Sequence, residues 1–170
     1  MNLTQKFLTK GKEKEIEFLK SYCSHFNIPE RCIEIASTQD DIHRHVDLWI
    51  DNEGWDVKAA KKENRTDSNP NYNIHWIELR NVHGKKGWIF GEASYIAFEL
   101  QDKWLCVPRK GIVAALVNKI DFTSFTSSRS SLYKVYRREG RKDAIVKVPV
   151  SFLLTIDNIS LIPKLCTPCT

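Results

Sequence analysis

Two acidic residues and a lysine lie close together on neighbouring apolar stretches of this chain. Asp47 lies in the first stretch, a glycine-containing turn follows, and Asp56 and Lys58 lie in the second stretch. In a β-hairpin, residues two apart point to the same face, so we expect Asp56 and Lys58 side by side with Asp47 on the neighbouring strand. Two carboxylates and an ammonium at one place can hold a divalent metal ion beside a phosphate.

A simpler interpretation of these three residues is also open. Asp56 and Lys58 could form an ordinary charge pattern on a solvated strand face, with Asp47 closing a turn. The apolar residues that alternate with Asp47 over residues 46–50 argue against this, because a solvated face has no need to gather all three ionisable groups. We therefore expect the cluster to be a site.

The composition is that of a folded protein, and its net charge favours an acidic partner. A chain of 170 residues, 42% hydrophobic and 28% charged, predicts a single domain over residues 1–170 with a real core. The net charge of +5, from 26 basic and 21 acidic residues, favours nucleic acid, although many ordinary proteins are as basic.

Other composition features argue against several classes of protein. The five cysteines are irregularly spaced and predict no disulfide framework. Cys166 and Cys169 have the spacing of a zinc-ligand pair, but a structural zinc needs four ligands and no second pair exists. No apolar run approaches the roughly 20 residues of a membrane span, and no signal-peptide stretch is visible. We expect no membrane partner and a cytoplasmic protein, in the host cytoplasm if the source is viral.

The periodicity of apolar residues predicts an α/β fold. Residues 12–26 have helical spacing, with Ile16, Leu19, Cys23 and Phe26 on one face. The further predicted elements are a strand at 32–36, a hairpin of 46–50 and 55–60, a loop at 61–73, a strand at 74–79, a turn at 81–91, a hairpin of 95–100 and 104–107, a helix at 112–120, a serine- and threonine-rich connector at 124–131, a strand at 144–148 and a short helix at 150–156. This order of helices and strands is typical of a mixed α/β domain.

The order of the acidic residues resembles a nuclease motif. A helix with a glutamate, a strand with Asp47 and a strand with Asp56-Val57-Lys58 resemble the PD-(D/E)XK nuclease superfamily, closest to small phage-type endonucleases and Holliday junction resolvases. The proline that often precedes the first acid is replaced by Val46, and the motif covers roughly residues 10–62. The resemblance implies a restriction-endonuclease-like core, with the N-terminal helix first and a mixed central sheet flanked by helices.

The helix glutamate has two candidates. Resolvase-like members tend to have a glycine, three residues and a glutamate, which Gly11 and Glu15 match. Helical geometry agrees, because Glu15 lies one turn before Leu19, at the edge of the apolar stripe. Glu17 points more to solvent and is the second choice.

The resemblance implies a role for each motif residue. Asp47, Asp56 and the Val57 carbonyl would bind Mg²⁺, with Mn²⁺ as an alternative, and Glu15 would add a ligand. Lys58 would position or help to deprotonate the attacking water and offset phosphate charge. The implied reaction is hydrolysis of a phosphodiester bond.

Basic residues outside the motif are candidates for DNA contact. Trp88 follows two of them in a glycine-rich turn and could stack on bases, although a core position is the commoner one. Glu78 and Arg80 lie near the end of a strand, and we favour an ion pair between them at the surface over a position beside the acids. We expect His45 to border the acids. The candidate DNA contacts are Lys61, Lys62, Arg65, Lys85, Lys86, Lys134, Arg137, Arg138, Arg141 and Lys142.

The sequence thus predicts a metal-dependent DNA endonuclease, with branched DNA as the leading substrate by analogy. Junction resolvases of this fold act as dimers, so the resemblance also implies a homodimer. The alternative is a catalytically inactive nucleic-acid-binding or interaction protein on the same fold. That alternative predicts no dependence on Asp47, Asp56 or Lys58.

Overall fold

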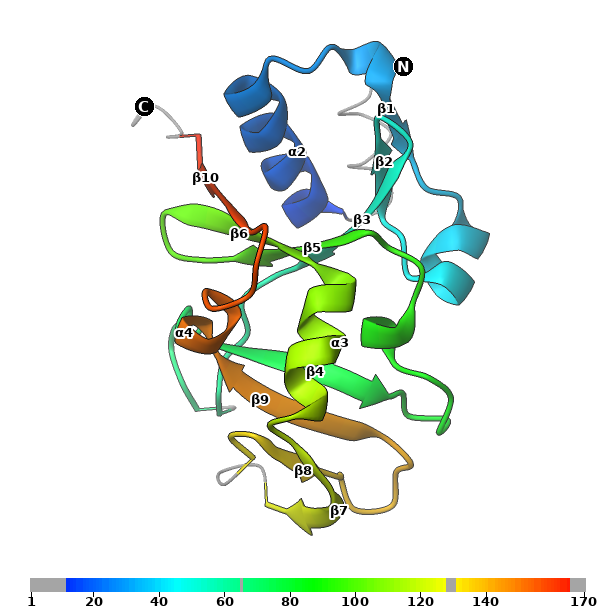
Figure 1. Cartoon of the computed structure of the whole chain (residues 1–170), viewed down its shortest axis with the longest axis vertical. Coiled ribbons are helices and arrows are strands. Elements are labelled where there is room, and N and C mark those ends of the chain that lie inside the picture. Colours follow the sequence, from blue (N-terminus) through cyan, green and yellow to red (C-terminus); the bar gives the residue numbers. More distant parts are fainter. Residues whose placement is uncertain (1–11, 65, 128–130, 166–170) are drawn as a thin grey trace.

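The structure, a computed structural model, describes residues 12–64, 66–127 and 131–165 (Figure 1). Gly11, Arg65, Cys166 and Cys169 lie outside the described residues. The chain forms an α/β fold in which a helix precedes two β-sheets. Within the described part of the chain, no helix is long and apolar enough to cross a membrane.

The helices are few and the strands are short. The α-helices are α2 (Glu13–Phe26), α3 (Arg109–Val117) and α4 (Val150–Leu153), and single turns of other helix types cover Glu30–Cys32, Asp40–Arg44 and Trp88–Phe90. The strands are β1 (Ile33–Ile35), β2 (Leu48–Ile50), β3 (Glu53–Lys58), β4 (Ile74–Arg80), β5 (Tyr95–Glu99), β6 (Lys103–Pro108), β7 (Asp121–Thr126), β8 (Lys134–Tyr136), β9 (Ala144–Pro149) and β10 (Ser160–Pro163).

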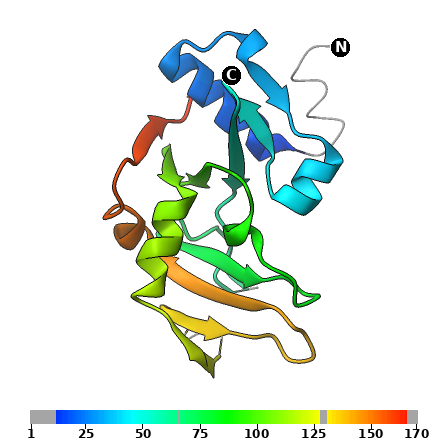
Figure 2. The same cartoon turned by 45° about the vertical axis from the view of Figure 1, so that its right-hand side comes forward.

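The strands divide between two sheets that lie toward opposite ends of the molecule (Figures 1 and 2). The larger sheet has the order β1-β2-β3-β5-β6-β10, and its strands are antiparallel except for the parallel pair β3–β5. The smaller sheet has the order β4-β9-β8-β7. The chain leaves the larger sheet after β3, forms β4 in the smaller sheet, and returns as β5.

Helix α2 packs on one face of the larger sheet through aromatic side chains. Phe18 is fully buried, and its ring centroid lies 5.4 Å from those of Trp55 and Trp104. Full burial of such a side chain contributes about 1.5–3 kcal/mol. Because side chains alternate along a strand, Trp55 and Val57 face α2, whereas Asp56 and Lys58 face the other side of β3.

A second core lies on that other side of the larger sheet. It joins Ile96 and Phe98 of β5 to Ile77 of β4 and Val146 of β9, which are all fully buried. Gly87 allows the turn before Trp88 to approach β4, because a Cβ at this position would collide with the Glu78 carbonyl. This close approach fixes Trp88 beside β3 and β4.

A buried carboxylate ties the first and last described elements together. Glu99, 3% exposed, lies 2.5 Å from Lys14 Nζ of α2 and 2.9 Å from Lys164 Nζ, directly after β10. Its Oε2 also accepts a hydrogen bond from the Ala60 N–H. The two ammonium groups offset the cost of burying the charge, and they lower the pKa of Glu99 against the opposing effect of burial.

Most of the predicted elements are confirmed. The N-terminal helix, both hairpins, the strands at 74–79 and 144–148 and the short helix after Pro149 are all present. The α/β class with a helix before mixed sheets is therefore established.

Three fold predictions need correction. The predicted mixed central sheet holds only some of the strands, because the strands form two sheets. The connector at 124–131 begins inside β7, and the helix predicted at 112–120 runs over Arg109–Val117. Strand β7 lacked the alternation of buried and exposed residues that reveals a strand, since all of its residues except Thr126 are exposed.

Candidate active site

The hairpin of β2 and β3 brings Asp47 and Asp56 together below the protein surface. Leu48 pairs with Trp55 in the antiparallel register, and the Asp47 N–H donates a hydrogen bond of 2.8 Å to the Trp55 carbonyl. Asp47 is 8% exposed and Asp56 is 2% exposed. The interpretation of Asp56 as part of a solvated charge pattern is therefore wrong.

Both oxygens of the Asp47 carboxylate have partners. Its Oδ2 accepts a hydrogen bond of 2.8 Å from the Val57 N–H, and its Oδ1 lies 3.4 Å from Lys12 Nζ. The first bond links the carboxylate to the backbone of the neighbouring strand. Asp47 is thus held in one orientation at the start of β2.

The Asp56 carboxylate has one oxygen with a partner and one without. Its Oδ1 lies 2.5 Å from Lys58 Nζ, whereas its buried Oδ2 has no hydrogen-bond partner among the described residues. Lys58 is also 4.8 Å from the ring centroid of Trp88, within the range of a cation–π contact. Trp88 is 8% exposed, which confirms that it is a core residue.

The cluster carries unfavourable negative charge. Burial raises the pKa of Asp56 well above its usual range; the charge of Lys58 opposes this shift, and the nearby Asp47 charge adds to it. Asp47 therefore lies near enough to Asp56 for its charge to affect the titration of that carboxyl. For Lys58, burial favours a lower pKa, but the charges of Asp56 and Asp47 outweigh it, so the pKa rises.

Glu15 is the helix glutamate that comes near these acids. It is half-buried, and its pKa is raised by burial and by the negative charges of Asp47 and Asp41. Glu17 instead lies 2.7 Å from Lys14 Nζ and 3.4 Å from Lys164 Nζ, in the group around Glu99. The electrostatic influence of Asp47 on Glu15, and the pairing of Glu17 with two lysines, favour the first choice of helix acid.

Lys12 and Asp41 are parts of the site that the sequence did not reveal. Lys12 Nζ lies 2.8 Å from Asp41 Oδ2 and bridges it to Asp47. Asp41 belongs to the turn of π-helix at Asp40–Arg44, and no residue spacing links it to Lys12. His45, which the sequence predicts to border the acids, is half-buried; burial and the positive charge of Lys58 lower its pKa against the charges of Asp41 and Asp47.

Strand β4 adds Glu78, whose charge acts on Lys58. Glu78 is half-buried, and burial raises its pKa against the opposing charges of Lys58 and Lys61. The predicted surface pair of Glu78 with Arg80 is wrong, because among the described residues no ion pair joins the two and Glu78 is half-buried. Desolvation and the charge of Lys58 lower the pKa of Lys61.

Most of the predicted DNA contacts are exposed. Arg138 is the exception, because it is half-buried and forms an ion pair with the buried Asp143. Arg65 lies outside the described residues. Val57 contributes its N–H to Asp47 and its side chain to the core under α2. The exposed candidates are Lys61, Lys62, Lys85, Lys86, Lys134, Arg137, Arg141 and Lys142.

The donor set fits a hard divalent cation with few protein ligands. Across residues 12–64, 66–127 and 131–165, no group of three or more His, Cys, Asp or Glu side chains is arranged to hold a metal ion. However, Asp47 and Asp56 present two adjoining carboxylates, and no described residue hydrogen-bonds Asp56 Oδ2. Mg²⁺ commonly binds through one or two carboxylates and completes its shell with water and substrate phosphate.

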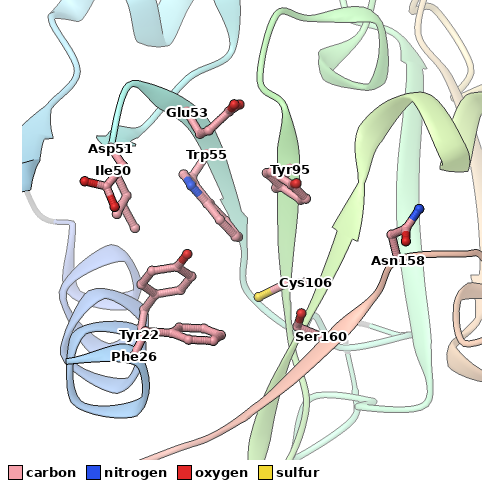
Figure 3. Close-up of a pocket in the computed structure, with 10 residues that line it drawn as sticks. All are labelled: Tyr22, Phe26, Ile50, Asp51, Glu53, Trp55, Tyr95, Cys106, Asn158 and Ser160. Atoms are coloured by element: carbon pink, nitrogen blue, oxygen red, sulfur yellow. The ribbon is translucent and has the colours of Figure 1, made fainter. Parts of the chain in front are cut away.

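A pocket of about 230 Å³ lies on the α2 side of the larger sheet (Figure 3). Trp55 and Tyr95 stack on its wall with ring centroids 4.7 Å apart, and Asp51 and Glu53 also line it. Since Trp55 and Asp56 are neighbours on β3, the pocket and the acidic cluster lie on opposite faces of this strand. Its two carboxylates would repel a phosphate.

The sequence matches no protein-family model, and no curated protein and no solved structure matches it.

Proposed function

We propose that this chain is a metal-dependent nuclease that hydrolyses phosphodiester bonds in DNA. The observation that carries the proposal is the buried pair of carboxylates Asp47 and Asp56, in which Lys58 Nζ lies 2.5 Å from Asp56 Oδ1 and Asp56 Oδ2 has no partner in the described part of the chain. Burial of two adjoining carboxylates is costly unless a proton or a cation compensates for their charge. A bound divalent cation would compensate for this charge.

Asp47 and Asp56 would hold Mg²⁺, and Glu15 would act through a water molecule in its shell. Mg²⁺ bound there would lower the pKa of a coordinated water and neutralise charge on the scissile phosphate. The assignment of the Val57 carbonyl as a further ligand is part of the same proposal, and Mn²⁺ is the alternative ion.

Lys58 would stabilise charge rather than remove a proton. Its pKa is raised by the charges of Asp56 and Asp47, despite the opposing effect of burial, so it keeps its proton at neutral pH. A fixed ammonium beside the metal ligands can orient the attacking water and offset the negative charge that develops on the phosphate.

A restriction-endonuclease-like core belongs to the proposal. Its support is the order of α2, the meander β1-β2-β3, and β5 parallel to β3, with the acids on β3 and immediately before β2. The excursion of the chain into the smaller sheet between β3 and β5 is an addition to that core. The suggested substrate class, branched DNA, and the homodimer follow from the resemblance alone.

The rival function is a nucleic-acid-binding protein of this fold without catalysis. One observation favours it: Lys12 Nζ already lies 3.4 Å from Asp47 Oδ1, where it offsets part of the negative charge without a metal. The two functions differ in whether Asp56 and Lys58 are needed for cleavage or only for folding.

Cleavage of a labelled substrate panel distinguishes them. The panel contains linear duplex, single strand, flap, four-way junction and supercoiled plasmid, each with Mg²⁺, Mn²⁺ or EDTA. We expect metal-dependent cutting by the wild-type chain and at least about a 100-fold loss in Asp56→Asn and Lys58→Ala, since each removes transition-state stabilisation. Lys110→Ala, an exposed lysine on α3, is the control. Unchanged cutting in both site variants, or cutting in EDTA, would contradict the proposal.

A further inference from the structure

The smaller sheet carries an apolar hollow that the proposed reaction does not use. It has a volume of about 250 Å³ and is lined by Phe90, Phe122 and Phe125, with Arg80 and Arg137 beside them. The three phenylalanines are 43%, 46% and 52% exposed. Contiguous exposed aromatic surface of this kind commonly marks a binding site.

The hollow combines flat apolar faces with positive charge. The Arg137 guanidinium lies 4.2 Å from the ring centroid of Phe125, and Arg80 and Arg137 are both exposed. Among the described residues that line the hollow, none is acidic. A partner that fits must therefore bring an aromatic or apolar plane together with negative charge, which is the chemistry of a nucleotide.

Two of the elements that line the hollow also carry residues beside the candidate active site. Phe90 lies on the same helical turn as Trp88, which contacts Lys58, and Arg80 lies two residues beyond Glu78 on β4. The hollow and the candidate active site therefore share two elements, the turn Trp88–Phe90 and strand β4.

We propose that this hollow binds an unpaired base of the DNA strand that is cut. Phe122 and Phe125 stack on the base, while Arg80 and Arg137 contact the adjacent phosphates. A base inside a duplex is already covered on both faces by its neighbours, so only an unpaired or extruded base can use these rings. The inference rests on the proposed nuclease function for its link to cutting, whereas base binding can be measured separately.

Binding is measured by fluorescence anisotropy in EDTA, where no cleavage interferes. The probes are a labelled short oligothymidine and a labelled blunt duplex of the same length. We expect Phe122→Ala and Phe125→Ala each to weaken binding of the single strand by about 5- to 100-fold, which is the range for loss of one stacked base. Binding of the duplex should change by less than about twofold.

Three further variants make the test specific. Phe26→Ala removes an equally exposed phenylalanine from α2 and should leave both affinities unchanged. Phe125→Trp keeps an aromatic face and should retain binding of the single strand. Phe125→Leu keeps the apolar volume without the ring and should lose this binding. It therefore tests the role of the ring even if the alanine variant fails to fold. Arg137→Gln should weaken both probes and reduce the salt dependence, because it removes a phosphate contact.

Equal affinity of Phe122→Ala, Phe125→Ala and wild type for the single strand would overturn the inference, as would an equal loss on both probes. These outcomes can be separated from failure of the nuclease proposal. If Asp56→Asn abolishes cutting but the phenylalanine variants bind normally, only the base-binding inference fails. If the phenylalanine variants lose the single strand but no substrate is ever cut, base binding stands and the nuclease proposal fails.

Discussion

The Val57 N–H donates a hydrogen bond of 2.8 Å to Asp47 Oδ2, so the carboxylate of one strand is anchored to the backbone of the next. Loss of this acceptor would leave a buried N–H unsatisfied. We expect Asp47→Ala to lower the free energy of unfolding by about 1–3 kcal/mol. Urea denaturation of the metal-free protein measures the change.

Asp47→Asn is the matched variant for that prediction. Its side-chain oxygen can still accept from Val57, so we expect a smaller stability loss than in Asp47→Ala. Both variants should nevertheless lose metal-dependent cleavage, because an amide binds Mg²⁺ more weakly than a carboxylate does. Equal stability of the alanine variant and the wild type would contradict the anchoring role.

Mg²⁺ should stabilise the folded chain, and Asp56 should be required for this effect. At a free concentration ten times its Kd, a ligand that binds only the folded state adds about 1.4 kcal/mol. We expect Mg²⁺ to raise the melting temperature of the wild type and to leave that of Asp56→Asn unchanged. Differential scanning fluorimetry with Mg²⁺ or EDTA measures this without any substrate.

The effect of Mg²⁺ on stability should grow with pH. The folded pKa of Asp56 is raised above its unfolded value by burial. The corresponding stabilisation is present in full below the unfolded pKa and is lost as the pH rises through the folded pKa. Mg²⁺ and the proton compete for the Asp56 carboxylate, so Mg²⁺ binds best at a pH where Asp56 has lost its proton. A stabilisation by Mg²⁺ that decreases with rising pH would contradict the proposed site.

The two glutamates of α2 should differ in their effect on cleavage. Glu15 lies near Asp47 and Asp41, whereas Glu17 pairs with Lys14 and Lys164. We expect Glu15→Gln to reduce the metal-dependent cleavage rate by at least about tenfold, as for a residue that positions the metal shell. Glu17→Gln is its matched control and should cut at nearly the wild-type rate, and the reverse order would identify Glu17 as the helix acid.

His75 should make the protein sensitive to acid. This residue is 3% exposed, and burial lowers its pKa to about 4. Because the folded pKa lies below the unfolded value of 6.5, the stability contribution is present above pH 6.5 and is lost as the pH falls toward 4. The shift corresponds to on the order of 3 kcal/mol.

Urea denaturation at several pH values between 4 and 7 tests this contribution. His75→Phe removes the titrating group and keeps a ring that can pack against Phe98, whose centroid lies 4.8 Å from that of His75. The decline in stability toward low pH should be flatter in the variant than in the wild type. Parallel declines would show that another group is responsible.

The local parts of the site could be predicted from the sequence. Alternation along two strands separated by a tight turn brings Asp56 beside Lys58 and Asp47 opposite them. Helical periodicity likewise orients Glu15 relative to Leu19. Both inferences need only the geometry of one element or of one hairpin.

The long-range parts could not be predicted in this way. Lys12 contacts Asp41 across 29 residues, and Glu99 contacts Lys14 across 85 residues. Such pairs depend on how separate elements pack against each other, and the spacing of residues along the sequence does not reveal this packing. Strand β7 was missed for a different reason, since its exposed residues give no burial pattern to read.

The Glu99 contacts also determine when the site can be completed during synthesis. Helix α2, which carries Glu15, is held to β5 and to the residue after β10 by one buried carboxylate. Lys164 emerges from the ribosome long after Asp47, Asp56 and Lys58. A nascent chain therefore carries the acids well before Lys164 can join Lys14 in offsetting the buried charge of Glu99, and this anchor of α2 is complete only after residue 164 has joined the fold.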